Sequence, residues 1–319
     1  MTLTRTPPVA PVRKPATPRK TPTRQEAKAG YVFLTPWLIG LFGITAIPIL
    51  MSLYLSFTSY DILTPWSEVQ WVGLANYKRM FTADPSYLHA VLVTVKFALI
   101  ATPLKLAAAL GVALLLNRER RGTGLFRSLF YLPSLLGSSV ALAIVWVRIF
   151  DRDGVVNAFL GIFGITGRPW VSSPEWALET LMVLAIWQFG APMVIFLAGL
   201  KQIPVELYEA AAVDGAGPVR KFFKITLPLL SPVIFFNLVL ETIHGFQGFT
   251  ASFVVSNGTG GPVDSTLMYT LYLYIRGFGN YEMGYASAMA WVFLVAVGLI
   301  TVVLFTTGRF WVHYSDEDD

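Results

Sequence analysis

Residues 208–232 read YEAAAVDGAGPVRKFFKITLPLLSP, a polar stretch between two long apolar runs. The residues around Glu209 are strong helix formers, and Gly215 can end that helix at little conformational cost. A second short helix is predicted around Phe222, with basic residues on its other side. It runs into Pro228, because proline suits the first turn of a helix. The stretch therefore predicts two short helices joined by a turn, where a connector of a few residues would do.

The composition of the whole chain is that of a membrane protein. Of its 319 residues 55% are hydrophobic and only 13% are charged, and the mean hydropathy is +0.59. A soluble domain carries roughly a quarter charged residues. The chain has no cysteine, which excludes disulfides, thiol catalysis and Cys-ligated metals. Its three histidines lie far apart in the sequence, so we expect no metal site.

The apolar runs predict an all-α membrane protein with six transmembrane helices. Each run holds the roughly 20 residues that cross about 30 Å of hydrocarbon. None alternates with period two, which disfavours a β-barrel. The predicted spans are Tyr31–Phe57, Leu88–Leu116, Phe126–Phe150, Leu178–Leu200, Leu227–Val255 and Gly284–Thr307.

The two ends of the chain differ from this apolar body. Residues 1–30 contain six prolines and seven Lys or Arg, and we expect a disordered tail. The alternative is a signal peptide, but the following run is longer than the roughly 7–15 residues of a signal core, and no small-residue cleavage site follows it. The predicted domains are thus the tail 1–30, the transmembrane domain 31–308 with a connecting segment at about 201–228, and an acidic tail 309–319.

The flanking charges predict the orientation. Sixteen Lys and Arg lie on the side of both termini and six on the other, with two further lysines inside a span. Because Lys and Arg are enriched in cytoplasmic segments, both termini are expected in the cytoplasm. The segment at 201–228 is then cytoplasmic too. On physical grounds alone it could equally lie on lipid headgroups, with its basic residues against anionic lipid, or dock to a partner protein.

The same segment closely resembles the EAA loop of the permease subunits of binding-protein-dependent ABC importers. Eleven positions stand at the spacing of that motif within 24 residues: Glu209, Ala210, Ala211, Asp214, Gly215, Ala216, Phe222, Ile225, Leu227, Pro228 and Pro232. The resemblance implies a coupling helix that seats in a groove of a cytoplasmic ATPase subunit. Glu209 would face that interface and Gly215 would allow the turn. Gly217-Pro218 departs from the family pattern and could alter the turn between the two helices.

Several short stretches along the rest of the chain resemble, more weakly, carbohydrate-uptake permeases of the maltose and glycerol-phosphate type. They include Leu34-Thr35-Pro36, Gly73-Leu74-Ala75-Asn76-Tyr77, Leu115-Leu116-Asn117, Tyr131-Leu132-Pro133, Gly260-Gly261-Pro262 with Ser265-Thr266, and Tyr285-Ala286-Ser287-Ala288. The opening resembles the first of two unlike permeases. The resemblance implies a second permease, two ATPase subunits that use ATP and Mg, an extracytoplasmic binding protein and a bacterial-type inner membrane. This chain itself would bind no cofactor.

Polar side chains inside the predicted spans mark a candidate substrate path, because such groups are costly in lipid. Asn237, Glu241 and His244 share one helix face of the fifth span, and Gln247 follows them. The family resemblance adds Trp187 and Gln188, since its sugar contacts lie in the fourth and fifth spans. The alternative is that these groups only bond neighbouring helices.

Lys105 lies inside the second span. It is about 17 Å along the helix from Leu116, and Glu241 is about 21 Å past Leu227, at comparable depth. We hypothesise that Lys105 and Glu241 pair or that both line the path. A contact between Lys105 and the second permease, or a backbone carbonyl, is the alternative.

These features favour a non-enzymatic permease that imports a sugar or sugar-like solute by alternating access. The chain has no GxxxxGK[ST], so ATP chemistry would belong to a partner subunit. An ion-coupled secondary transporter is the alternative function. It leaves the EAA loop unexplained, and no inverted repeat is obvious. An intramembrane enzyme is disfavoured because HExxH, GxSxG and cysteine are absent.

Overall fold

The computed structural model describes residues 24–118, 122–137 and 139–313. Their regular structure is helical, apart from an isolated bridge between Thr58 and Trp71, so the all-α prediction is confirmed. The chain divides into two compact units, residues 1–51 and 52–319. Residues 1–23 and 314–319, which hold most of the two predicted tails, lie outside the described part.

Five helical stretches are long and apolar enough to cross a membrane. They are Tyr31–Ser56, Pro85–Leu116, Ala177–Gln202, Pro218–Val255 and Met283–Gly308. They correspond to five of the six predicted spans. The remaining one becomes a bent pair, so the described part of the chain has five candidate spans, or six if that pair counts as one.

The predicted span Phe126–Phe150 is not one continuous helix. It consists of α5 (Thr123–Leu136) and α6 (Val140–Ile149), which meet at 105°. Gly137 ends α5 with a φ of +47°, a conformation that an L side chain rarely adopts. The Ser139 hydroxyl then accepts the Leu142 N–H at 3.1 Å and caps the new helix. The two residues together change the direction of the chain.

The first unit contains α1 (Arg24–Ile39), a π-helical stretch at Gly40–Ala46 and the first half of α2 (Ile47–Ser56). Helix α1 begins at Arg24 rather than at Tyr31, where the apolar run starts. Charged and polar residues of the predicted tail thus form its first turns.

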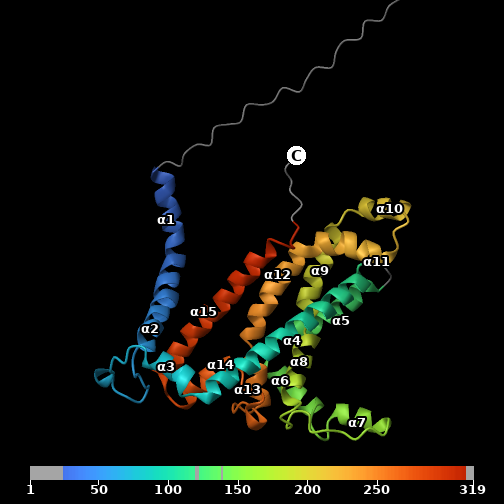
Figure 1. The fold of residues 1–319 in the computed structure, drawn as a ribbon. Helices are drawn as coiled ribbons and strands as arrows, with labels where there is room; N and C mark the ends of the chain where they lie inside the picture. Colours follow the sequence, from blue (N-terminus) through green and yellow to red (C-terminus); the bar gives the residue numbers. More distant parts are fainter. Residues whose placement is uncertain (1–23, 119–121, 138, 314–319) are drawn as a thin grey trace, which may run out of the picture. The chain divides into compact units, whose positions relative to one another are not determined.

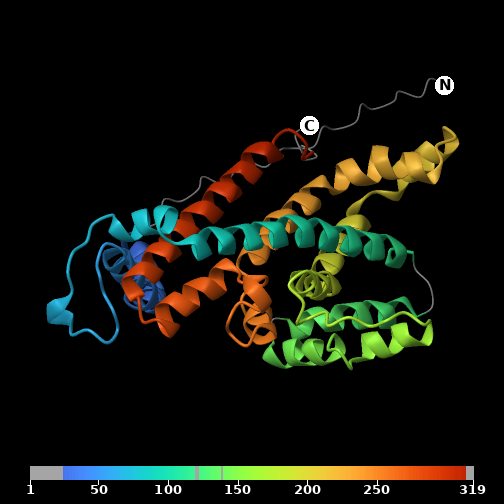
Figure 2. The same ribbon diagram turned by 60° about the horizontal axis from the view of Figure 1, so that its bottom comes forward.

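In the second unit, the long helix α4 (Pro85–Leu116) lies at the centre. It packs against α8 (Ala177–Trp187), α9 (Gly190–Gln202) and α12 (Leu227–Phe246) (Figures 1 and 2). Small residues allow these close approaches, as is usual in membrane bundles. Ala109 of α4 is fully buried, and a Cβ on Gly199 would lie 2.8 Å from Val233 of α12.

A cluster of buried charges joins the N-terminal end of α4 to the second half of the chain. Asp84 caps α4 and is 5% exposed. Its Oδ2 accepts hydrogen bonds from Tyr272 at 2.6 Å and Tyr285 at 2.7 Å, and Arg276 lies 3.2 Å away. These partners come from α14 (Tyr269–Tyr274), the π-helical stretch Ile275–Gly279 and α15 (Met283–Gly308). Glu282 extends the cluster by bonding Arg276.

Burial disfavours the charge on Asp84, but the two tyrosine hydroxyls and the Arg276 guanidinium outweigh it. The pKa of Asp84 therefore lies below its ordinary value of 3.8. Burial and the hydrogen bond to Asp84 in turn raise the pKa of Tyr272 to about 12. Because the folded pKa of Asp84 is depressed, the stability it contributes is present above its unfolded value and is lost as the pH falls through the lowered value.

We expect Asp84→Asn to destabilise this end of the bundle. The amide removes the charge that Arg276 and both hydroxyls face, and a weakened buried network of this kind costs about 1–3 kcal/mol. The measurement is the thermal unfolding temperature of the purified complex in detergent at pH 7. Asp151→Asn is the matched control, because the Asp151 carboxylate is half exposed and 4.0 Å from Arg148. Equal melting temperatures for the two variants would show that the Asp84 carboxylate does not stabilise this end of the bundle.

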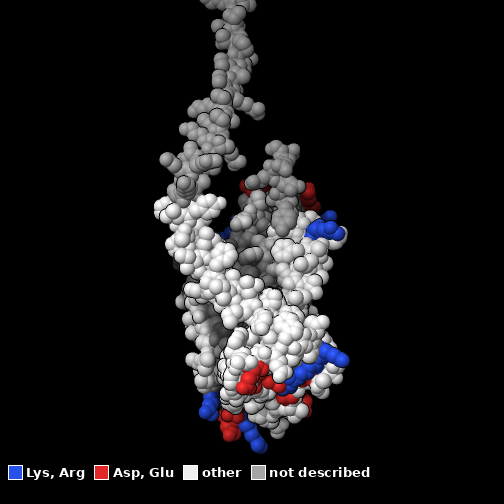
Figure 3. Space-filling model, turned by 90° about the vertical axis from the view of Figure 1, so that its left-hand side faces the viewer, with Lys and Arg blue, Asp and Glu red and all other residues white. Residues whose placement is uncertain are grey.

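The charged residues are unevenly placed. In Figure 3, Lys, Arg, Asp and Glu gather in one group at the lower end of the molecule, and much of the other described surface in this view is uncharged. Many apolar side chains of the helices are exposed, among them Leu99, Leu299 and Phe305. Large exposed apolar surface of this extent fits a lipid environment.

Candidate functional site

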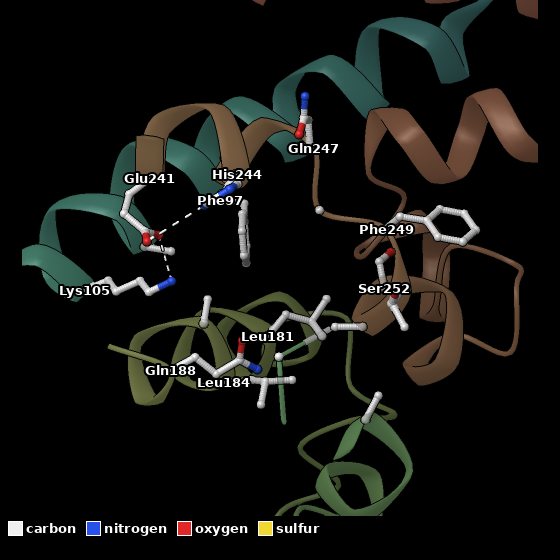
Figure 4. Close-up of a pocket in the computed structure, with 18 of the residues that line it drawn as sticks. Phe97, Lys105, Leu181, Leu184, Gln188, Glu241, His244, Gln247, Phe249 and Ser252 are labelled. Carbon is white, nitrogen blue, oxygen red and sulfur yellow. Dashed lines mark ion pairs between the residues drawn. The ribbon is translucent and has the colours of Figure 1, made fainter. Parts of the chain in front are cut away.

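A cavity of about 440 Å³ lies among α4, the α5–α6 bend, α8, α12 and α13 (Thr250–Val255). Figure 4 shows its side chains: Lys105 and Phe97 from α4, Gln188 and Leu184 at the α8 wall, and Glu241 and His244 from α12. Volumes of 300–1,000 Å³ are typical of small-molecule sites. A mostly apolar wall with a few polar groups is also typical of them.

An ion pair occupies one end of the cavity. Lys105 Nζ lies 2.7 Å from Glu241 Oε2, and the two side chains are 16% and 9% exposed. The pairing hypothesised from their similar depth is present in the structure. His244 Nδ1 lies 3.9 Å from the other carboxylate oxygen, one turn further along α12. The structure thus gives a buried pair with a third polar group towards the open space (Figure 4).

Small residues bring α12 close enough to α4 for this contact. A Cβ on Gly245 would lie 3.0 Å from Thr102 Oγ1 and 3.5 Å from the backbone of Ala98. The Thr102 hydroxyl donates to the Glu241 carbonyl at 3.3 Å. Gly245 therefore lets the polar face of α12 lie against α4.

The opposite wall of the cavity lies at two interruptions of helical structure, the break between α8 and α9 and the bend between α5 and α6. Gln188 follows the last residue of α8, and α9 starts two residues later. Gly190 lies against α5, since a Cβ there would be 2.5 Å from the Phe130 carbonyl. Ser134 and Ser139 from the two sides of the α5–α6 bend also line the cavity. This wall therefore presents an amide and two hydroxyls.

The third side lies where α12 ends. Helix α12 stops at Phe246, and α13 begins at Thr250. Phe249 in this break packs in tilted ring contacts against Phe253 and Tyr274, with ring centroids 5.4 Å apart in each pair. Ser252 donates to the Thr266 carbonyl at 2.5 Å and holds α13 in place. An aromatic ring thus borders the cavity on this side.

Five of the seven residues predicted for the path line this cavity: Lys105, Gln188, Glu241, His244 and Gln247. Two do not. Trp187 lies at the end of α8, where its ring stacks on Trp146 at 5.9 Å. Asn237 precedes Glu241 by one turn and is 1% exposed, so it is buried in helix packing. Its Nδ2 has no hydrogen-bond partner among the described residues.

The sequence interpretation missed the α5–α6 contribution, Ser134, Gly137 and Ser139. A signal was available, because Pro133, Gly137 and three serines interrupt an otherwise apolar run. Proline and glycine near the middle of a predicted span indicate a bend that can line a cavity.

The segment around residues 201–228 forms the two predicted short helices. Helix α10 (Val205–Val213) ends at Asp214, and Gly215 follows with a φ of +74°. The Ala216 N–H then donates to the Ala211 carbonyl at 2.8 Å, which closes the helix end. Helix α11 (Pro218–Lys221) begins at the proline that departs from the family pattern, and Pro218 occupies its first turn. That proline is compatible with the turn.

The chain stays helical from α11 into the next span. A π-helical stretch at Phe222–Thr226 joins it to α12, and residues 218–255 form one candidate span. The hydroxyls of Tyr208 and Thr226 lie 2.9 Å apart and tie α10 to this helix. This hydrogen bond therefore links α10 to the start of the continuous helix that carries Glu241.

The surface of α10 is open. Four of the eleven motif positions are exposed: Glu209, Ala210, Asp214 and Gly215. The other seven are half-buried: Ala211, Ala216, Phe222, Ile225, Leu227, Pro228 and Pro232. Helix α10 contains no buried residue. Val213 is 89% exposed, and Val219 and Phe223 are exposed as well.

The chain matches the family model described as the binding-protein-dependent transport system inner membrane component over residues 105–317. It is 52% identical over 297 residues to the probable ABC transporter permease protein YesP of Bacillus subtilis (strain 168), covering 93% of this chain and 95% of that protein. It is 34% identical to the lactose transport system permease protein LacF of Rhizobium radiobacter, covering 88% and 94%. It is 31% identical to the trehalose/maltose transport system permease protein MalF of Thermococcus litoralis, covering 90% and 95%.

Among solved structures, a bacterial alginate ABC transporter in complex with an alginate pentasaccharide-bound periplasmic protein is similar in fold. The TM-score is 0.76 at 21% identity, over 89% of this chain and 95% of that one. Family members of this kind are not catalytic themselves. The helical architecture and the match over residues 105–317 agree: the chain belongs to the inner-membrane permeases of binding-protein-dependent ABC importers, in the carbohydrate-uptake group.

Proposed function

We propose that this permease moves a sugar or sugar-like solute into the cytoplasm by alternating access, driven by ATP hydrolysis in a partner subunit. The observation that carries the proposal is the cavity of about 440 Å³ at the centre of the helices. It offers amide, hydroxyl and carboxylate groups for sugar hydroxyls, and Phe249 for stacking on a ring. Relatives named for lactose and for trehalose/maltose transport support a sugar as the cargo.

The proposed topology has six spans and both termini in the cytoplasm. It counts α5 and α6 as one bent span, because the two helices together are long and apolar enough to cross a membrane. The excess of Lys and Arg beside α1, α5 and α11 supports this orientation. The α10–α11 segment then lies on the cytoplasmic side, and the Asp84 cluster lies on the outer side.

Helix α10 is proposed as the coupling helix that docks to the ATPase. The exposed surface of α10 supports this proposal. It contains Glu209 but also the apolar side chains of Ala210 and Val213, and exposed apolar surface is typical of interaction sites. The continuous helical stretch from Pro218 into α12 supplies the physical connection between that surface and the Lys105–Glu241 pair. Closure of the ATPase dimer would pull α10 and thereby move the wall of the cavity.

The proposed assembly has three further kinds of component. A second, unlike permease would complete the pathway, and two ATPase subunits would bind ATP and Mg. An extracytoplasmic solute-binding protein would deliver the sugar. The alginate transporter structure, which includes a periplasmic binding protein, is consistent with such an assembly. This chain would bind no cofactor.

The test is a reconstituted complex of this permease with its partner permease and ATPase in liposomes. Radiolabelled lactose, trehalose and maltose are offered with the cognate binding protein. We expect uptake of one sugar that requires ATP, and ATP hydrolysis that rises when the loaded binding protein is added. Uptake that persists without the ATPase subunits would instead indicate an ion-coupled transporter. ATP-driven transport of a non-sugar solute would retain the mechanism and reject the cargo.

A further inference from the structure

Helix α7 (Val155–Ile162) has its polar and apolar sides reversed relative to a helix of a soluble protein. Its single polar side chain, Asn157, is 9% exposed, while Val155, Phe159 and Ile162 are 68%, 59% and 77% exposed. These three positions follow the i, i+4, i+7 spacing of one helix face. Phe163 and Ile165 extend the exposed apolar surface just beyond the helix. Residues 154–166 contain no Asp, Glu, Lys or Arg.

Hydrogen bonds of Asn157 hold this helix at the level where α6 ends. Its Nδ2 donates to the carbonyls of Asp151 at 3.2 Å and Arg152 at 2.9 Å, directly after α6, and to that of Arg168 at 2.7 Å. Its Oδ1 accepts from Trp170 Nε1 at 2.6 Å. Asn157 thus fixes both the entry and the exit of the α7 loop, which extends outward from α6 and α8 at one end of the bundle (Figure 1).

Charged and aromatic side chains border the apolar face, with three arginines beside Asp151 and Asp153. Arg148 is 81% exposed at its side chain, and Arg152 and Arg168 are exposed as well. The Arg168 guanidinium lies 5.2 Å from the Trp176 ring, and that ring packs edge-on against Trp170 at 5.4 Å. Arginine and tryptophan are enriched where membrane proteins meet lipid headgroups.

We propose that α7 is an interfacial helix that lies in the lipid headgroup layer, with Val155, Phe159 and Ile162 against the acyl chains. The arginines at its rim would meet lipid phosphates. Lipid fits this face better than a protein partner does. An eight-residue helix is only about 12 Å long, too short for the roughly 1,000 Å² that a specific protein interface buries, and the face offers no hydrogen-bonding group. In the proposed topology the helix would lie in the outer leaflet.

The absence of cysteine in this chain allows a direct measurement of depth. Single variants Phe159→Cys and Ile162→Cys are spin-labelled in the complete importer, with any cysteine of the partner subunits replaced by serine. The complex is placed in liposomes of phosphatidylcholine and phosphatidylglycerol. Ser172→Cys, exposed in the same loop beyond Asn157, is the matched control. Collision with oxygen, which partitions into lipid, is compared with collision with a water-soluble nickel chelate.

We expect both α7 labels to collide more with oxygen than with nickel, and the Ser172→Cys label to show the reverse. ATP hydrolysis of each labelled complex verifies that it is assembled. Greater nickel accessibility at both α7 positions would overturn the proposal, because the face would be in water. Labels that are immobile and shielded from both reagents would also overturn it, in favour of the second permease. The comparison gives the same answer for either leaflet, so it does not depend on the proposed orientation.

Discussion

Replacing Val213 with aspartate is expected to separate this permease from its ATPase while leaving its own fold intact. Val213 is 89% exposed at the end of α10, so the change removes no packing inside the chain. If α10 seats in a groove of the ATPase, the new carboxylate is buried there without a partner. Such a charge costs about 3–5 kcal/mol, which weakens binding by a factor of about 100 or more. The ATPase should no longer co-purify, and uptake should cease.

Two comparisons make this result specific. Val213→Leu keeps an apolar surface of similar size, and we expect it to retain the ATPase and most of the transport activity. The melting temperature of the permease portion should be unchanged in Val213→Asp, because no intramolecular contact is removed. A Val213→Asp complex that keeps its ATPase and its transport rate would show that α10 does not dock through this surface.

The helices could be predicted from sequence because length and hydropathy determine what can cross a bilayer. The bounds of the predicted span Leu88–Leu116 agree with those of α4 to within three residues. Those of Gly284–Thr307 agree with α15 to within one residue at each end. The bend between α5 and α6 could not be predicted in this way. Both sides of Gly137 are apolar, so hydropathy does not show the bend. Pro133, Gly137 and the nearby serines signal an interruption of the run, and the positive φ of Gly137 together with the Ser139 cap gives the new direction.

The candidate site was partly predictable for a similar reason. Lys105 and Glu241 could be paired because the rise of a helix converts residue number into depth. The rotation of each helix about its axis is set by packing against its neighbours, and sequence spacing alone leaves it open. Asn237 therefore shares a helix face with Glu241 yet is enclosed by neighbouring side chains, and Trp187 turns to Trp146 instead of the cavity.

Lys105→Met is expected to destabilise the complex strongly, because Glu241 would keep its charge at 9% exposure without the ammonium 2.7 Å away. Glu241→Gln should have the converse effect on Lys105. Removing one partner of a buried ion pair costs about 3–5 kcal/mol, whereas removing both is often close to neutral. The double variant should therefore melt at a higher temperature than either single variant. Thermal unfolding of the purified complex measures this coupling, and strictly additive effects would contradict it.

Transport measurements distinguish a structural role of the Lys105–Glu241 pair from a role in sugar transport. His244 lies 3.9 Å from Glu241 and its side chain is 64% exposed, so the carboxylate is held at the cavity wall rather than deep in the packing. If the pair only joined α4 to α12, the double variant would regain uptake together with stability. We expect stability to return without uptake, because methionine and glutamine restore the packing but remove both charges from the cavity. A double variant that transports at the original rate would limit the pair to a structural role and move the sugar contacts towards Gln188 and Phe249.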